Sequence, residues 1–134
     1  MYSNKQLKST PQPISDAELL GLINLGIIVL RDVACEHPQL FVAGRAVKAH
    51  LNPQGGRNRI FGSDRYRWKV QVGGKCRRIM RSKLVWMYVH RKVVPPDHVI
   101  HHGKLGRLFD GIQNLSLESD ASHKAIHYGY QEPF

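Results

Sequence analysis

Histidines near the end of the chain are the side chains best suited to chemistry. His101 and His102 are adjacent, and His123 and His127 lie four residues apart. Helical residues at that spacing project from the same face, so His123 and His127 can coordinate one metal ion, as HxxxH pairs do in zinc sites. Surface histidines at this spacing also occur without a metal, and the pair alone leaves both interpretations open.

The residues around these histidines predict the order strand, loop, strand, helix. Residues 99–102 (VIHH) and 114–118 (NLSLE) are strand-like, and residues 103–113 between them are rich in turn formers. Residues 119–129 begin with types that cap helices. Neighbouring strand residues point to opposite faces, so the two adjacent histidines cannot both be simple ligands of one ion without a bend in the chain.

This constellation resembles the HNH endonuclease family, whose ββα-metal motif contains a His-His or Asp-His pair, an Asn in the second strand and a His in the helix. The pair here is His101-His102, followed by Asn114 twelve residues later and His123 nine residues after that. The preceding KLVWMYVHRKVVPP is similar to a stretch of phage and intron-encoded members. The resemblance covers residues 66–129 and is specific, because several fixed spacings must coincide.

The resemblance implies a role for each of these residues. His102 is expected to be the general base, since an imidazole can take a proton from an attacking water near neutral pH. Asn114 is expected to keep the loop closed through its carboxamide and so to fix the orientation of His102. The alternative is an ordinary Asn in a turn or at the start of a strand. His101 and His123 are expected to bind the metal, with His127 as a third ligand or a phosphate contact.

The implied cofactor is one divalent metal ion. It is expected to bind the scissile phosphate and stabilise the departing 3′ oxygen. Many relatives carry Asp at the position of His101. Histidine donors suit Mn²⁺, Ni²⁺ or Zn²⁺, whereas Mg²⁺ prefers oxygen. Mg²⁺ or Mn²⁺ is the expected ion, with Ni²⁺ or Zn²⁺ as alternatives.

The loop between the two predicted strands departs from the family pattern. Leu105 and Phe109 stand where small or amide residues are common, and Asp110 replaces a frequent Asn. These changes are expected to alter loop packing without touching the catalytic atoms. One nearby basic residue is expected to contact the phosphate beside the scissile bond; the candidates are Arg81, Arg91, Lys104 and Arg107. Four other histidines have no partner at an interpretable spacing and are expected to be surface or partly buried side chains: His37, His50, His90 and His98.

The charge of the chain is concentrated in one segment. Twenty Lys and Arg against ten Asp and Glu give a net charge of +10, and residues 65–92 contain ten basic residues and no acidic one. Such an excess indicates a polyanionic partner, by default a nucleic acid, the alternative being a merely soluble basic protein.

Within this segment the pattern predicts a β-hairpin. Apolar and polar residues alternate over 65–72, Gly73-Gly74 suits a two-residue turn, and residues 75–81 return as a second strand. The solvent-exposed face of the hairpin is a cationic ribbon that can lie along DNA phosphates or enter a major groove. The alternative is a charged face that is only solvated and binds no partner. The expected DNA contacts are Arg65, Arg67, Lys69, Gln71, Arg77, Arg78 and Arg81.

Helix-capping residues and short apolar runs predict the other elements. Ser15 and Glu18 have capping-box spacing at the start of a short helix, and residues 27–30 and 41–47 are β-like. Ser82 is expected to cap a second helix that ends before Pro95-Pro96. One face of that helix should carry Leu84, Val85, Tyr88 and Val89.

These elements predict an α+β fold: a small antiparallel sheet or hairpin with flanking helices, then a C-terminal ββα-metal motif. The expected parts are a flexible arm (1–13), a helix with strands (14–64) and a unit containing the basic hairpin, linking helix and nuclease motif (65–134). Cys35 and Cys76 are too few for a disulfide framework, and the absence of CxxC excludes a cysteine-held zinc staple.

No stretch is long and apolar enough for a membrane span, and the first residues lack a secretory signal, so a cytoplasmic location is expected, including the host cytoplasm for a phage-encoded protein. The expected function is that of a metal-dependent HNH-type DNA endonuclease or nickase, with a homing or genome-processing role. The expected partner is double-stranded DNA, with no membrane and no obligate protein partner. The alternative is a non-catalytic nucleic-acid-binding protein with a structural or degenerate HNH metal site.

Overall fold

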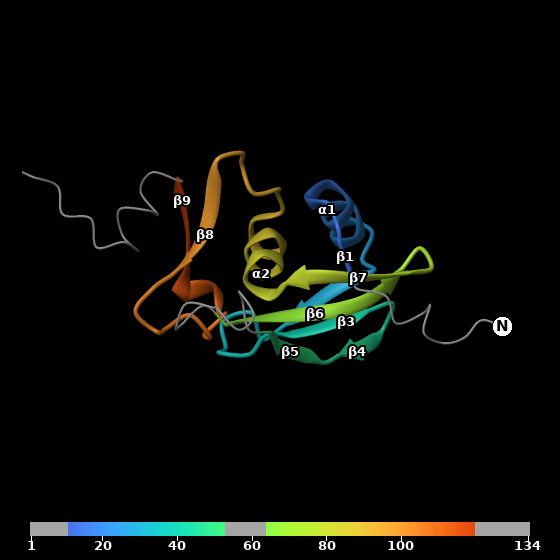
Figure 1. Cartoon of the computed structure of the whole chain (residues 1–134), viewed down its shortest axis with the longest axis horizontal. Coiled ribbons are helices and arrows are strands. Elements are labelled where there is room, and N and C mark those ends of the chain that lie inside the picture. The colour runs from blue at the N-terminus through green and yellow to red at the C-terminus, as the bar shows by residue number, and fades with distance from the viewer. Residues whose placement is uncertain (1–10, 53–63, 120–134) are drawn as a thin grey trace, which may run out of the picture.

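A computed structural model describes residues 11–52 and 64–119, which form a mixed α/β structure with two α-helices and three small sheets (Figure 1). The prediction of an α+β fold is confirmed at this level. The four-stranded sheet has the order β1 (Gln12–Pro13), β7 (Lys75–Met80), β6 (Arg65–Val72) and β5 (Ala49–Asn52). The three-stranded sheet consists of β2 (Ile28–Arg31), β3 (Gln39–Val42) and β4 (Arg45–Val47). The third sheet is the hairpin of β8 (His98–His102) and β9 (Leu115–Ser119).

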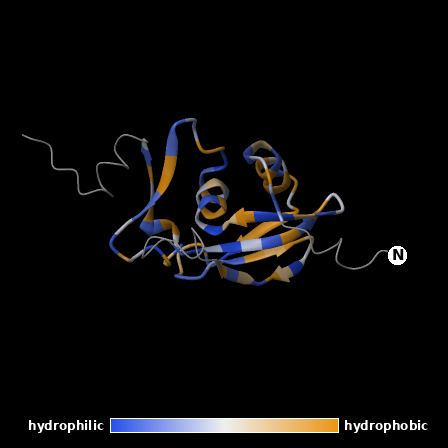
Figure 2. Ribbon diagram, in the orientation of Figure 1, coloured by the Kyte–Doolittle hydropathy of each residue, from blue (hydrophilic) through white to orange (hydrophobic). Residues whose placement is uncertain are grey.

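The basic hairpin forms as the sequence predicts. Gly73 and Gly74 have φ values of 62° and 78°, the left-handed conformation that a two-residue hairpin turn requires and that glycine adopts without steric cost. Trp68 pairs with Ile79 across the strands, and both side chains are buried. Figure 2 shows the alternation of hydrophilic and hydrophobic residues along β6 that places one face in the core.

Helix α1 (Asp16–Asn24) begins at the predicted cap. The Ser15 hydroxyl oxygen accepts a hydrogen bond from the Glu18 backbone N–H at 3.1 Å, which satisfies one of the amides left free in the first turn. Leu19 and Ile23, four residues apart, are its buried side chains. The helix therefore presents one apolar edge to the core, as its sequence pattern indicates.

Helix α2 (Arg81–His90) begins one residue before the predicted cap. Met80 occupies the N-cap without a side-chain hydrogen bond, and Ser82 lies buried in the first turn, so the predicted cap is wrong. The strand β7 runs directly into the helix, which leaves no loop residue to act as a cap. Arg91 ends the helix in a left-handed conformation at φ 56°.

Most of α2 is buried, rather than one face of it. Leu84, Val85, Trp86 and Met87 are four consecutive residues that all belong to the hydrophobic core, whereas Val89 is exposed. Consecutive buried residues mean that the helix is covered on several sides. The single apolar face predicted to include Val89 is therefore wrong, because neighbours surround the first two turns and leave the last turn at the surface.

The predicted strand over residues 41–47 is two strands. β3 and β4 form a hairpin, with Val42 opposite Arg45 and a turn at Ala43-Gly44 whose φ values are 50° and 82°. The sequence hides this turn because alanine rarely adopts positive φ, so Ala-Gly is a weak hairpin signal compared with Asn-Gly.

The two strands of the histidine region are confirmed with small shifts. β8 begins one residue early at His98, and β9 begins at Leu115, opposite His102. Asn114 is the last residue of a 3₁₀ turn, η3 (Ile112–Asn114), rather than part of the strand. The predicted flexible arm over 1–13 is wrong at its end, because Gln12 and Pro13 form β1 and pair with β7. Residues 1–10 of that arm, part of the loop around 53–63 and the predicted helix over 119–129, apart from Ser119, lie outside the described residues.

In the view of Figure 1, α1 and α2 lie above the β6–β7 hairpin, β3 to β5 lie below it, and β8 and β9 stand at one end beside α2. A single hydrophobic core joins side chains from α1, α2, the four-stranded sheet, the three-stranded sheet and β9. Among the described residues no helix is long and apolar enough to cross a membrane.

Candidate functional site

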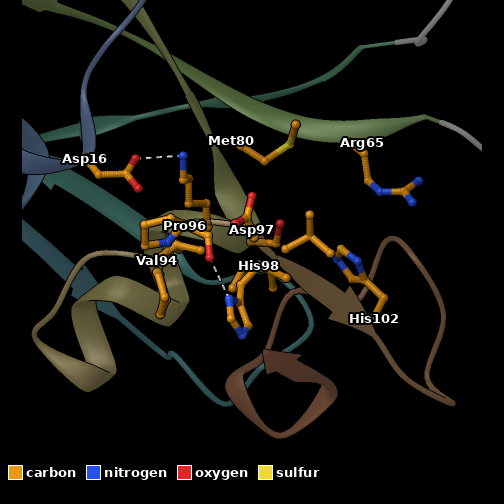
Figure 3. A pocket seen from close by; sticks show the side chains of 13 residues that line it. Asp16, Arg65, Met80, Val94, Pro96, Asp97, His98 and His102 are labelled. Atoms are coloured by element: carbon orange, nitrogen blue, oxygen red, sulfur yellow. Dashed lines mark hydrogen bonds and ion pairs between the residues drawn. The ribbon is translucent and has the colours of Figure 1, made fainter. Parts of the chain in front are cut away.

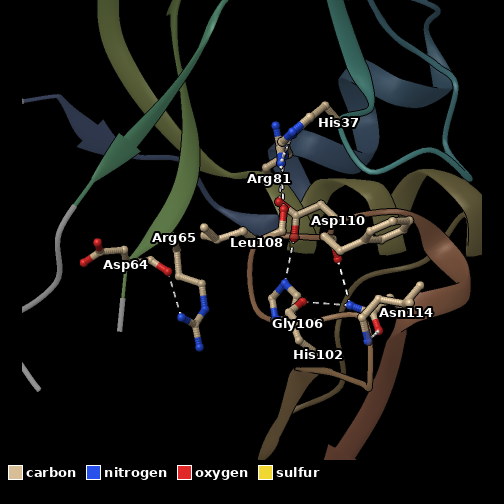
Figure 4. A network of polar contacts seen from close by, with 11 residues as sticks. His37, Asp64, Arg65, Arg81, His102, Gly106, Leu108, Asp110 and Asn114 are labelled. Carbon is tan, nitrogen blue, oxygen red and sulfur yellow. Dashed lines mark hydrogen bonds and ion pairs between the residues drawn. The ribbon is translucent and has the colours of Figure 1, made fainter. Parts of the chain in front are cut away.

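His102, the last residue of β8, is held by a buried carboxylate (Figure 4). Its Nε2 lies 2.7 Å from Asp110 Oδ1, and the two side chains are 7% and 2% exposed. A carboxylate paired with an arginine is ionised and can only accept hydrogen bonds, so Nε2 carries the proton and Nδ1 is the basic nitrogen. The expectation that the change at Asp110 does not touch His102 is wrong, because the loop folds back and places the Asp110 carboxylate on the imidazole.

The other oxygen of Asp110 is held by Arg81, the first residue of α2. Arg81 Nε donates to Asp110 Oδ2 at 2.7 Å, and both side chains are 2% exposed. Arg81 Nη2 lies 3.1 Å from His37 Nδ1 and donates to the Leu108 carbonyl at 3.3 Å. The guanidinium carbon lies 4.0 Å from the centre of the Tyr66 ring.

One sequence-based prediction about this network is therefore wrong. Arg81 does not lie on an exposed strand as a DNA contact, since β7 ends at Met80 and the Arg81 side chain is buried in the network. His37 is at the surface as predicted, with its side chain 53% exposed, but it also contacts Arg81, which nothing in its sequence neighbourhood shows. Contacts between residues 44 positions apart depend on tertiary folding and leave no local pattern.

Asn114 closes the loop that carries Asp110. Its Oδ1 accepts from the Leu105 backbone N–H at 3.0 Å, and its Nδ2 donates to the carbonyls of Gly106 and Phe109, each at 2.9 Å. The Asn114 backbone carbonyl also accepts from Gly103 N–H at 2.9 Å. A carboxamide, which both donates and accepts, can make this set of bonds. The loop is thereby held in the conformation that brings Asp110 to His102.

The same loop is fixed against residues 33–36 of the N-terminal half. Three hydrogen bonds join them: Asp110 N–H to Glu36 O at 3.0 Å, Ile112 N–H to Val33 O at 2.7 Å, and Gln113 Nε2 to Ala34 O at 2.7 Å. A Cβ added to Gly111 would lie 2.7 Å from the carbonyl oxygens of Ala34 and Cys35, so glycine permits this close approach. The N-terminal half is therefore part of the frame of the site.

A groove of about 490 Å³ opens beside His102 (Figure 3). Arg65 and Met80 of the basic hairpin line it together with His98 and His102. Lys83 and Asp16 also line it and form an ion pair of 2.6 Å. His101 is not among the described residues that line this groove.

A second hollow adjoins the first and contains more of the basic hairpin. Arg67 and Arg78 line it, and it shares Met80 and Lys83 with the groove beside His102. The hairpin and the histidine strand, which the sequence places about thirty residues apart, thus line two hollows that share residues.

One face of the hairpin gathers positive charge. Arg65, Arg67, Lys69 and Gln71 alternate along β6, and the register places Arg78 opposite Lys69 on the same side. We call these five residues the cationic face. Burial lowers the pKa of Arg67, and the nearby Arg78 charge lowers it further. Burial likewise lowers the pKa of Arg65, with a further contribution from Arg107. Burial is the larger cause of both pKa shifts and a neighbouring guanidinium adds to each, so a bound anion would favour the charged form of both side chains.

Arg77 does not belong to the cationic face. It pairs with Val70 in the register, so it lies on the opposite side of the hairpin from Arg78. Its Nη2 donates to Glu18 Oε1 and to the Pro13 carbonyl, each at 3.2 Å. Adjacent strand residues point to opposite faces, so the contact of Arg77 with DNA stays a prediction separate from the cationic face.

Residues 65–92 contain no acidic residue, but in the folded chain some of their basic side chains form ion pairs with acids from elsewhere. Among the described residues, acids from other parts of the sequence pair with at least three of the ten basic residues of this segment. The pairs are Glu18–Arg77, Asp16–Lys83 and Asp110–Arg81. The charge available to a ligand is therefore smaller than the sequence count.

The metal ligands expected from the resemblance are only partly described. His101 lies on β8 opposite Ser116, while His123 and His127 fall outside the described residues. Within 11–52 and 64–119, no group of three or more His, Cys, Asp or Glu side chains is arranged to hold a metal ion.

The chain matches no protein-family model, and the searches found no significantly similar curated protein or solved structure. Only the residues and the geometry of the site therefore point to a function.

Proposed function

We propose that the protein is a metal-dependent HNH-type DNA endonuclease or nickase in which His102 is the general base. One observation carries the proposal: the His102 imidazole, bonded to the buried Asp110 carboxylate, lines a groove that Arg65 of the cationic face also lines. A base with a fixed tautomer beside a phosphate-binding surface is what hydrolysis of a phosphodiester requires.

In the proposed reaction His102 Nδ1 takes a proton from a water molecule as its oxygen attacks the phosphorus. The bond from phosphorus to the 3′ oxygen breaks and this oxygen takes a proton from a solvent water, giving a 5′-phosphate and a 3′-hydroxyl. The Asp110 carboxylate, 2.7 Å from Nε2, stabilises the imidazolium formed in this step. Asn114 keeps the intervening loop closed, so that Asp110 stays within reach of His102.

The donor set proposed for the metal is His101 with His123, and with His127 as a third ligand or a phosphate contact. Imidazole nitrogens suit borderline ions such as Mn²⁺, Ni²⁺ and Zn²⁺ better than Mg²⁺, so the chemistry of the set fits a divalent transition metal. Such an ion supplies Lewis-acid stabilisation of the phosphate and of the leaving oxygen.

The cationic face is proposed to hold the DNA backbone. Lys69 and Gln71 are exposed, and Arg65 connects this face to the groove beside His102. Arginine can bind phosphate through two parallel hydrogen bonds, and glutamine can reach a base edge. Double-stranded DNA following this face would bring one phosphodiester toward His102.

The test is metal-dependent nicking or linearisation of supercoiled plasmid. Purified protein is incubated with chelator or with Mg²⁺, Mn²⁺, Ni²⁺ or Zn²⁺ in turn, alongside His102→Ala. We expect cleavage that chelator abolishes, and a His102→Ala variant that binds DNA with unchanged affinity but is at least about 100-fold slower, the usual range for losing a general base.

His90→Ala is the matched control, since His90 is the exposed last residue of α2 and lines neither hollow. Its cleavage rate should equal that of the wild type. A wild type that binds DNA but cleaves with none of the four metals would support the non-catalytic nucleic-acid-binding alternative and overturn the endonuclease proposal.

A further inference from the structure

Arg81 contacts several separate parts of the chain around the buried carboxylate. It begins α2, bonds Asp110 Oδ2 and the Leu108 carbonyl in the loop after β8, contacts His37 in the N-terminal half, and lies over Tyr66 of β6. Figure 4 shows the line of contacts from His37 through Arg81 and Asp110 to His102.

We propose that Arg81 is a positioning residue for His102, acting through Asp110. By holding Oδ2, it fixes the carboxylate in the orientation in which Oδ1 accepts the His102 Nε2 proton. The tautomer and orientation of the imidazole are then set by a guanidinium that does not itself line the groove. Only the use of His102 as a base depends on the proposed function; the positioning itself does not.

The geometry requires arginine rather than lysine. Nε and Nη2 point in different directions from one rigid plane, so one bonds the carboxylate while the other reaches Leu108 O and His37. The flat guanidinium also stacks on the Tyr66 ring. A lysine ammonium could keep the charge next to Asp110, but it has neither the planar shape nor the two fixed directions.

The direct readout is the proton on His102 Nε2, observed by NMR of ¹⁵N-histidine-labelled protein and assigned by its loss in His102→Ala. In the wild type this proton is buried in a hydrogen bond and should exchange slowly with water. In Arg81→Lys, which keeps the charge, exchange should be about tenfold faster or more, because the carboxylate is no longer fixed in two directions.

The matched control is Arg31→Lys. Arg31 also lies over an aromatic ring, that of Phe41 at 4.7 Å, but it is on β2 and lines neither hollow. Exchange of the His102 proton should be unchanged there. Tyr66→Leu is a second test variant that removes the stacking partner and keeps the ion pair; it should accelerate exchange less than Arg81→Lys, and it decides the question if Arg81→Lys does not fold.

Cleavage kinetics give a second readout on the same variants. In Arg81→Lys the rate of cleavage of bound DNA should fall about tenfold to 100-fold while the DNA dissociation constant stays the same, since misplacing a reacting group affects the chemical step. Equal proton exchange in folded Arg81→Lys, Tyr66→Leu and wild type would overturn the positioning role. A wild type without nuclease activity would overturn the proposed function instead, and the exchange rates would still decide the role of Arg81.

Discussion

Asp110 joins two partners that lie on opposite sides of it, His102 through Oδ1 and Arg81 through Oδ2. Its side chain is nearly inaccessible, as is that of Arg81. Taking these charges out of water is costly, and their attraction compensates only while both partners are present. The site is therefore sensitive to the loss of either charge, even though neither residue is a proposed metal ligand.

We predict that Asp110→Ala lowers the free energy of unfolding by about 3–5 kcal/mol, because it leaves Arg81 charged and buried without its partner. Urea unfolding followed by tryptophan fluorescence measures the change. Asp16→Ala is the control, since it breaks the Asp16–Lys83 pair, whose side chains are 23% and 39% exposed. That loss should be about 1 kcal/mol or less, as for other solvated ion pairs. Equal losses in the two variants would contradict the buried-pair argument.

At the scale of secondary-structure elements, the β6–β7 hairpin separates its charges by face. The adjacent residues Arg77 and Arg78 lie on opposite faces of the hairpin. Arg77 pairs with Glu18 of α1, whereas Arg78 lies opposite Lys69 on the cationic face. The alternation of β6 was visible in the sequence, where apolar residues mark the buried side. In β7 both neighbours are arginine, so hydrophobicity alone did not show which one belonged to which face.

We predict that Arg67→Gln and Lys69→Gln each weaken DNA binding and reduce the slope of log K against log salt by about 0.9, as expected for one lost phosphate contact. Arg77→Gln removes the same charge from the other face and should change the slope much less. Fluorescence anisotropy with a labelled duplex over a range of salt concentrations measures the slopes. If Arg77→Gln had the larger effect, the cationic face would be wrongly assigned.

At the scale of the whole molecule, the N-terminal half completes the site. Residues 33–36 hold the loop that carries Asp110 through backbone and side-chain hydrogen bonds, and His37 contacts Arg81. The sequence predicts a helix and strands in this half but no part in the site. The N-terminal half contributes backbone carbonyl groups that accept hydrogen bonds from the loop carrying Asp110, and any residue type can supply a backbone carbonyl.

We predict that Gly111→Ala pushes the loop away from residues 34 and 35, because its Cβ would lie 2.7 Å from two backbone carbonyl oxygens. The free energy of unfolding should fall by about 1–3 kcal/mol, as in other overpacked positions, and plasmid cleavage should fall with it. Gly21→Ala is the control: it lies in α1 with nothing within 4 Å of the added Cβ, so the helix should be unchanged or up to about 1 kcal/mol more stable. Equal stability of the two variants would mean that the loop is not held tightly against the N-terminal half.

Local chemistry made several elements predictable from the sequence. The Ser15 cap, the Gly73-Gly74 turn and the two strands around His102 and Asn114 depend on neighbours in the chain, and the structure has them close to the predicted positions. The errors have a common origin. Ser82 was expected to cap a helix that starts directly from a strand, and Ala43 adopts a conformation that alanine rarely takes.

Residue types at short spacings were enough to predict the helices and strands, the concentration of basic residues in one segment and the histidine pattern that resembles HNH endonucleases. The bond between Asp110 and His102, the burial of Arg81, and the place of His37 and residues 33–36 at the site depend on long-range folding and had no local signal. The physical reason is that a buried charge must find its partner in space, and the partners of Arg81 lie 29 and 44 residues away along the chain.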